Sequence, residues 1–306
     1  MVTRHTYASV DELRDYLVGT SYASGWTSDA AILRRIVESA TQSIDQHVGM
    51  QSFGPRTETR SYDIGTGSLR DSHQTFQRSM SGTIVNPIDS LRQAIPLGAW
   101  LISTTTVTSY KQTARTESET LAEGYGNDYL LEPYNTSPKQ VLKLNEDTTK
   151  GFYGGQQTFT ILGQWGYSNE TESVTTLDGA LNSSATSFDV ASASGLSVAQ
   201  TILVDTEQMY ITAISSNTLT VEREVNGTTA ASHLTAAGVS KYLYAYGVAQ
   251  ACLDLGKLKF RDRDQGATDI LGSGTEGVTR ANESMKSVLK TLDPYRMTAT
   301  YESVVF

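Results

Sequence analysis

The apolar residues of this chain follow a helical period only near its two ends, and this limits the folds open to it. Within residues 28–48 an apolar residue recurs at every fourth position, which predicts an amphipathic helix that a glycine then ends. A shorter helix is predicted before it, because Ser9 and Glu12 have the spacing of a capping box. Helical period returns at residue 241 and again over residues 279–292. The body of the protein is therefore expected to begin and end with helices.

Between these helices the chain has the composition of β-strands. Segments rich in threonine, valine, isoleucine and tyrosine, bounded by glycine, proline and asparagine, predict strands at 57–64, 100–110, 129–132, 140–145 and 156–165. The composition then changes. Residues 169–240 hold eight acidic residues and one base, Arg223, so this stretch carries −7 of the net charge of −9. Short strands separated by turns in this stretch predict a small antiparallel module.

These patterns predict an α+β fold, in which a helical bundle packs with a small antiparallel β-sheet or sandwich and carries an inserted all-β domain. The expected body is formed by residues 1–168 and 241–306. The expected insertion is the acidic all-β domain at 169–240, because the composition changes at both of its ends. Residues 297–306 are expected to form an extended C-terminal arm.

Charge and cysteine content narrow the class of protein. The net charge of −9 argues against a protein that wraps nucleic acid, because phosphate binding needs a net positive face. The single cysteine, Cys252, excludes an intrachain disulfide, and its place on an apolar helical stripe favours a core position. We find no signal-peptide pattern in the first residues and no apolar run long enough for a membrane span. We expect a soluble protein made in a cytoplasm, with no membrane partner.

Motifs for a catalytic, metal or cofactor site are weak. Residues 272–277 fit G-x-G-x-x-G, but no buried strand precedes them, so a loop between helices is favoured over a dinucleotide site. Asp262 and Asp264 have EF-hand spacing, but the glycine and glutamate that complete a calcium loop are missing. The four histidines have no metal-ligand spacing. We therefore predict that the protein is not an enzyme and has no catalytic residue, metal or cofactor. An enzyme of unfamiliar type would need a buried pocket with converging polar side chains.

Four stretches of the expected body occur in a fixed order. They are the helix over 32–49 with Thr59-Arg-Ser-Tyr-Asp63 after it, Val85-Asn-Pro-Ile-Asp-Ser-Leu91, Tyr129-Leu-Leu-Glu-Pro-Tyr134 with Val141-Leu-Lys-Leu-Asn145, and Thr158-Phe-Thr-Ile-Leu-Gly-Gln-Trp-Gly-Tyr167. This order and spacing resembles the head–tail connector (adaptor) proteins of tailed bacteriophages over 1–168 and 241–306. The resemblance implies a few helices around a small β-sheet or sandwich, and no catalytic residues. Residues 169–240 are similar instead to a small β module that recurs in phage structural proteins.

The resemblance also implies a function. It predicts a structural adaptor in the neck of the virion, where about a dozen copies form a ring between the portal protein above and a tail or tail-completion protein below. Such a ring is a docking platform and a conduit that DNA passes without tight binding. The alternative is a tail or baseplate component with a receptor- or carbohydrate-binding β domain. That alternative predicts exposed aromatic residues in 169–240, where the aromatic residues are Phe188 and Tyr210.

The end of the chain is predicted to dock on the portal. Asp293 and Pro294 stop the last helix, because proline cannot continue it. The residues after them favour strands and end on apolar side chains, which suits addition to a neighbour's sheet edge or groove. The resemblance makes the portal the expected acceptor, with docking residues Tyr301, Val304, Val305 and Phe306. The alternative is an arm that packs on its own body as an edge strand.

Two further groups of basic residues are candidates for contacts in a ring. Arg34 and Arg35 lie on the polar face of the helix over 28–48 and are candidates for the ring interface, the alternative being a solvated face. The other group clusters near the end of the helix that follows residue 241, with acidic residues interleaved, so we expect only weak contact with passing DNA. These candidate conduit residues are Lys257, Lys259, Arg261 and Arg263.

Overall fold

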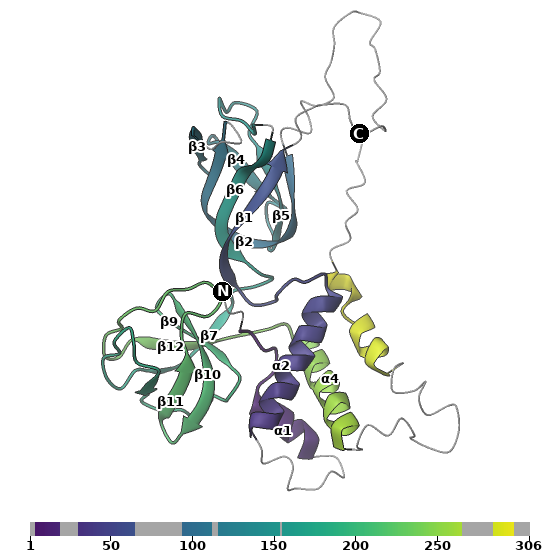
Figure 1. The fold of residues 1–306 in the computed structure, drawn as a ribbon, viewed down its shortest axis with the longest axis vertical. Coiled ribbons are helices and arrows are strands. Elements are labelled where there is room, and N and C mark those ends of the chain that lie inside the picture. Colours follow the sequence, from purple (N-terminus) through teal and green to yellow (C-terminus); the bar gives the residue numbers. More distant parts are fainter. Residues whose placement is uncertain are drawn as a thin grey trace, which may run out of the picture. The chain divides into compact units, whose positions relative to one another are not determined.

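The computed structural model describes residues 4–18, 30–64, 94–111, 116–153, 155–264 and 284–296. They belong to two compact units (Figure 1). The first unit is drawn from residues up to 56 and from residue 168 onward, and the second unit is formed by residues 57–167. In the part of the chain that the structure describes, no helix has both the length and the apolar character needed to cross a membrane.

Three helices of the first unit come from distant parts of the sequence and contact one another. They are α1 (Val10–Val18), α2 (Ala30–His47) and α4 (Tyr246–Asp264). The predicted stripe of α2 faces this contact, since its buried residues are Leu33, Ile36, Val37, Ala40, Thr41 and Ile44. Farther along the chain, residues 284–290 are helical and a 3-10 turn, η1 (Asp293–Tyr295), follows with proline in its first turn.

Local sequence explains how α1 begins and how α4 packs. The predicted capping box is confirmed, because the Ser9 amide donates to Glu12 Oε2 at 2.6 Å and the Glu12 amide donates to Ser9 Oγ at 3.2 Å. Gly256 lets α4 come close to α1. A Cβ added there would lie 3.0 Å from Leu13 Cδ1, which is tighter than ordinary van der Waals contact.

The first unit also contains a six-stranded antiparallel sheet, in the order β7-β12-β9-β10-β11-β8. Its strands are β7 (Thr171–Thr176), β8 (Ser187–Asp189), β9 (Thr201–Val204), β10 (Glu207–Ser215), β11 (Thr218–Glu222) and β12 (Gly238–Tyr242). Side chains of one face form an apolar core that includes Ile202, Met209, Leu219 and Val239. The sheet is joined to α1, because the Val10 amide donates to the Val198 carbonyl at 3.1 Å.

A buried ionic cluster joins Glu207 of β10 to Arg223 and His233, which lie between β11 and β12. Arg223 donates to both carboxylate oxygens of Glu207, at 2.8 and 2.6 Å, and His233 Nε2 lies 3.0 Å from Glu207 Oε2. The side chains of Arg223 and Glu207 are 5% and 0% exposed. Burial alone would raise the pKa of Glu207, but hydrogen bonds from Arg223, the Ala231 amide and His233 outweigh it and lower that pKa. Glu207 is therefore held as a carboxylate inside the sheet.

The second unit is a rolled antiparallel sheet. Its strands are β1 (Arg56–Ile64), β2 (Ala94–Tyr110), β3 (Ser118–Leu121), β4 (Tyr129–Glu132), β5 (Lys139–Leu144) and β6 (Gly155–Trp165), in the order β1-β6-β2-β5-β4 with β3 on β2. Ile64 of β1 and Leu131 of β4 come from opposite ends of that order, yet both belong to one buried core with Phe159 and Trp165. The sheet therefore curls around its own core (Figure 1).

The predicted fold class is wrong. In the described residues, twelve strands in two six-stranded sheets form most of the regular structure, and helices are the minority. The molecule is not a helical bundle packed with a small sheet. The physical reason is that the second unit's sheet encloses an apolar core of its own and needs no helical layer to cover it.

The individual helices and strands were predicted better than the fold class. The strands expected at 57–64, 129–132, 140–145 and 156–165 are confirmed as β1, β4, β5 and β6, and β2 begins earlier than the expected 100–110. The helix expected from residue 241 begins later, at Tyr246, because residues 238–242 form β12. The division into a body and an inserted domain stays a prediction. Residues 169–240 fall in the same compact unit as α1, α2 and α4.

Candidate functional site

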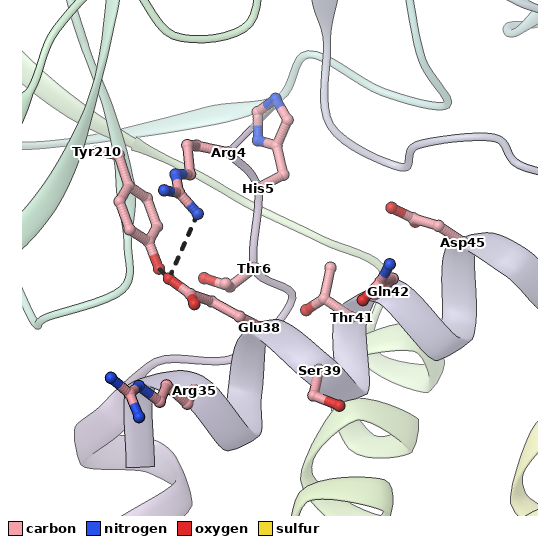
Figure 2. Close-up of a pocket in the computed structure, with 10 residues that line it drawn as sticks. All are labelled: Arg4, His5, Thr6, Arg35, Glu38, Ser39, Thr41, Gln42, Asp45 and Tyr210. Atoms are coloured by element: carbon pink, nitrogen blue, oxygen red, sulfur yellow. Dashed lines mark hydrogen bonds and ion pairs between the residues drawn. The ribbon is translucent and has the colours of Figure 1, made fainter. Parts of the chain in front are cut away.

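A polar groove of about 480 Å³ in the first unit is the candidate functional site (Figure 2). The N-terminal segment before α1, the polar face of α2 and one residue of β10 form its walls. Its lining residues are Arg4, His5, Thr6, Arg35, Glu38, Ser39, Thr41, Gln42, Asp45 and Tyr210. Charged side chains of both signs meet here, so their pairing decides what the groove can do.

Glu38 of α2 is the centre of the charge network. Its Oε1 accepts a hydrogen bond from the Tyr210 hydroxyl at 2.9 Å and lies 3.7 Å from Arg4 Nη1. Figure 2 shows both side chains pointing at the Glu38 carboxylate. Arg34 Nε lies 3.8 Å from the same oxygen, one helical turn away. Burial and the Glu38 charge raise the pKa of Tyr210, so this phenol stays protonated and acts as the donor.

Arg4 joins α2 to the sheet of the first unit. Its Nε and Nη2 donate to the two Glu222 carboxylate oxygens at 2.8 and 3.3 Å, in the forked geometry that arginine favours. The Arg4 guanidinium also lies over the Tyr210 ring, 5.5 Å from its centroid. The Arg4 backbone is fixed as well, because its amide donates to Asn226 Oδ1 at 2.7 Å and its carbonyl accepts from Asn226 Nδ2 at 2.9 Å. This wall of the groove is therefore rigid.

His5 is a buried neutral histidine. Its Nε2 lies 2.8 Å from the Pro55 carbonyl and its Nδ1 lies 2.9 Å from the Tyr244 hydroxyl. A carbonyl only accepts, so Nε2 carries the proton and Nδ1 accepts from Tyr244. Burial lowers the pKa of His5 to about 4, so the ring carries no charge at neutral pH. Gly54 makes room for it, since a Cβ there would lie 2.4 Å from His5 Nδ1.

Asp45 lies at the other end of the groove and accepts a short hydrogen bond from the Tyr7 hydroxyl. The same hydroxyl accepts from the Phe53 amide at 2.9 Å. Burial raises the pKa of Asp45 to about 7, although the Tyr7 hydrogen bond and the charge of Arg56 act in the opposite direction. A carboxyl with such a pKa is a group that can change charge near neutral pH.

The central charged groups of the groove are already paired with one another. Glu38 and Arg4 are engaged with each other and with Tyr210 and Glu222. Burial raises the pKa of the Cys252 thiol to about 12, which keeps the thiol protonated, and Cys252 is in the core as predicted. Among the residues that the structure describes, no group of His, Cys, Asp and Glu side chains is arranged to hold a metal ion.

The two predicted ring-interface arginines have different environments. Arg34 is half-buried beside Glu38. Arg35 is exposed on the rim of the groove and forms no ion pair with any of the described residues. The structure therefore separates the two: Arg34 is part of the internal network, and Arg35 is the cation that faces outward.

The predicted conduit residues lie along the second half of α4. Lys257 Nζ lies 5.2 Å from the centroid of the Tyr16 ring, and Arg261 lies 3.9 Å from Asp262. Lys259 is half-buried and Arg263 is exposed. The predicted arm residues Tyr301, Val304, Val305 and Phe306 lie outside the described residues, and so do residues 272–277.

Sequence reasoning missed Arg4, His5 and Asp45 as members of one site. Arg4 is separated from Glu222 by more than two hundred residues, so no local spacing could reveal the pair. The sequence signal for this site was a charged residue, Arg4, a few positions before the α1 capping box. The aromatic residues of 169–240 were singled out, and here Tyr210 is buried and Phe188 is half-buried.

Comparison of the chain with protein-family models, with curated proteins and with solved structures found no match. The resemblance to phage connector proteins therefore remains a hypothesis that rests on the sequence stretches described above.

Proposed function

We propose that this protein is a structural head–tail adaptor of a tailed phage. About a dozen copies form a ring in the neck of the virion, with the portal protein above and a tail or tail-completion protein below. DNA passes through the ring without tight binding. The protein works by assembling with its neighbours and not by catalysis.

The observation that carries this proposal is the packing of helices from the two ends of the chain. α1 and α2 contact α4, although the strands of both β-sheets lie between them in the sequence. The contact is close, with Gly256 of α4 against Leu13 of α1 and Thr41 Oγ1 of α2 3.6 Å from Cys252 Sγ. The connector resemblance covers these same helices on both sides of residues 169–240, and it expects them to form one body.

Surface charge gives a second line of support. A ring made by head-to-tail contacts needs two different surfaces on each copy. Arg35 presents an exposed cation on α2. Exposed carboxylates lie in and next to the strands of the first unit's sheet, at Glu170, Asp178, Asp189 and Glu224. Opposite charges on the surface of one chain can steer neighbouring copies together and set their orientation.

The C-terminal arm provides the experiment. We expect a chain that lacks residues 300–306 to unfold at nearly the same temperature as the full chain, but to fail to bind assembled portal rings in a sedimentation assay. Val305→Asp should also fail, because a charge in an apolar docking groove is costly. Ser303→Asp is the matched control, with the same new charge at a polar position.

A truncated chain that still sediments with the portal rings would count against the proposal. If that chain also loses much of its thermal stability, the arm belongs to this chain's own core. The alternative, a receptor-binding β domain at 169–240, receives no support from the aromatic residues there, because Tyr210 is buried and Phe188 is half-buried.

A further inference from the structure

A hollow of about 720 Å³ on the second unit is separate from the groove and has different chemistry. It lies where the loop after β3, residues 122–128, meets the loop after β5, residues 145–150, with Tyr134 beside them. Two tyrosines of this lining are exposed, Tyr125 at 97% and Tyr134 at 55%. Exposed aromatic rings that line one hollow are typical of binding sites, because they offer a large apolar face to a ligand.

Tyr125 is displayed by a tight turn. The Asn127 amide donates to the Gly124 carbonyl at 3.0 Å and closes a four-residue turn with Tyr125 in its second position. Gly126 occupies the third position with φ of +82°, the left-handed conformation that a type II turn requires and that glycine adopts at no steric cost. The sequence around Tyr125 therefore fixes the backbone that carries the ring.

Side chains of the neighbouring loop brace this turn. Asn145 Nδ2 donates to the carbonyls of Gly124 and Asn127, at 2.9 and 2.8 Å. Asp128 accepts from the Ala122 amide, Thr148 Oγ1 and Lys150 Nζ, each at 2.8 Å. A loop held by this many internal bonds loses little conformational entropy when a ligand binds. Tyr125 is thus an exposed aromatic ring on a pre-organised support.

Tyr134 is held on the other side of the hollow. Its hydroxyl donates to Glu132 Oε1 at 2.7 Å. Lys139 Nζ donates to the carbonyls of Pro133 and Tyr134, at 2.7 and 3.0 Å. The ring is therefore tethered through its hydroxyl, and Tyr134 remains exposed.

The charges of the lining indicate the class of ligand. Glu146, Asp147 and Lys143 line the hollow, and their side chains form no hydrogen bond or ion pair with the described residues. Such charges are depleted from the core of protein–protein interfaces. An anionic ligand would meet the carboxylates and a cationic ligand would meet Lys143 and Lys150. A neutral ligand with many hydroxyl groups can donate to the carboxylates and accept from the ammonium groups.

We propose that this hollow binds a neutral oligosaccharide, with Tyr125 and Tyr134 as stacking platforms and Glu146, Asp147 and Lys143 as hydrogen-bonding partners. Its volume lies within the range of ordinary ligand sites, about 300–1,000 Å³. The site lies on the second unit and does not depend on the proposed ring.

The test uses the full-length chain on an array of neutral and acidic oligosaccharides, followed by calorimetric titration with the neutral saccharide that binds best. We expect binding to neutral glycans with a Kd of about 1 mM or below. Tyr125→Ala and Tyr134→Ala should each weaken it at least tenfold. Tyr246→Ala is the matched control, because Tyr246 is 95% exposed but lies on α4 of the first unit. Circular dichroism should be unchanged in all three variants.

Three outcomes would overturn the proposal. They are an array with no bound glycan, an array on which only acidic glycans bind, and neutral binding that is equally strong in Tyr125→Ala and the wild type. Loss of a protein partner in Tyr125→Ala, with no glycan bound by the wild type, would also overturn it and would assign the hollow to protein docking.

Discussion

Replacing Arg223 by methionine tests the buried ionic cluster of the first unit. The guanidinium donates to both Glu207 oxygens and also to the carbonyls of Asn182, Ala185 and Ala231. It therefore joins the loop after β11 and the loop before β8 to the start of β10. Methionine has a similar length but no donor, so the substitution removes these bonds without leaving a large cavity.

The expected loss of stability follows from what remains around Glu207. Its side chain is 0% exposed and keeps only the Ala231 amide at 2.9 Å and His233 Nε2 at 3.0 Å as partners. Breaking a buried ion pair by removing one partner costs about 3–5 kcal/mol. This is a large part of the roughly 5–15 kcal/mol that stabilises an ordinary domain. The double variant Arg223→Met/Glu207→Leu should recover part of the loss, because no unpaired charge remains buried.

Urea unfolding followed with two probes measures the stability of each unit separately. The probe for the second unit is tryptophan fluorescence in a Trp26→Phe background, because Trp26 lies outside residues 57–167 of that unit. The remaining tryptophans, Trp100 and Trp165, are both buried in the second unit, so their fluorescence reports on that unit and should not change. Hydrogen exchange of peptides from residues 181–240 reports on the sheet of the first unit. There the midpoint should fall by about 1–5 M urea, given the loss of about 3–5 kcal/mol and slopes of about 1–3 kcal/mol/M.

Lys241→Met is the matched control, because Lys241 lies on the same sheet and pairs with a carboxylate that is 55% exposed, Glu172. A surface pair of this kind is worth about 0–1 kcal/mol. A midpoint in Arg223→Met that matches the Lys241→Met midpoint would refute the reasoning. So would a double variant that is less stable than Arg223→Met.

Two further predictions concern the second unit and the groove. Gly163→Ala should destabilise the second unit by about 1–3 kcal/mol, because the new Cβ would lie 2.5 Å from the Ser103 carbonyl oxygen on the paired strand. A urea titration followed by fluorescence of Trp100 and Trp165 measures this loss, and an unchanged midpoint would contradict the prediction. Burial raises the pKa of Asp45 to about 7, so its contribution to stability is present below about pH 4 and lost as the pH rises through about 7. Asp45→Asn should remove that loss of stability. The free energy of unfolding is measured by urea titration at pH 5 and at pH 8, and an equal change between the two pH values in the variant and the wild type would contradict the prediction.

Helices and strands with a strong local sequence pattern were predicted correctly. The Ser9–Glu12 capping box and the apolar stripe of α2 depend on near neighbours, and both are confirmed. Within 169–240 the sequence predicts strands at 187–190, 200–205, 209–215 and 218–223. It does not predict β7 and β12, because their sequences, Thr-Glu-Ser-Val-Thr-Thr and Gly-Val-Ser-Lys-Tyr, are largely polar and lack a clear alternation. β7 pairs with β12, and β12 also pairs with β9; this pairing makes them strands and is a long-range property.

The candidate sites were less predictable for the same reason. Arg4, Glu38 and Glu222 are distant in the sequence and meet only in the fold, so no motif joins them. The composition of Gly124-Tyr125-Gly126-Asn127 predicts a turn, and the structure has one there. The exposure of Tyr125 at its apex could not be predicted, because it depends on where the two loops of the hollow meet.

The copy number of the full-length chain on assembled portal rings tests the proposed adaptor function most directly. Native mass spectrometry of the purified mixture measures it without labels. We predict one dominant species with about twelve copies of this chain on each portal ring. A chain that stays monomeric in the presence of assembled portal rings would contradict the proposed function.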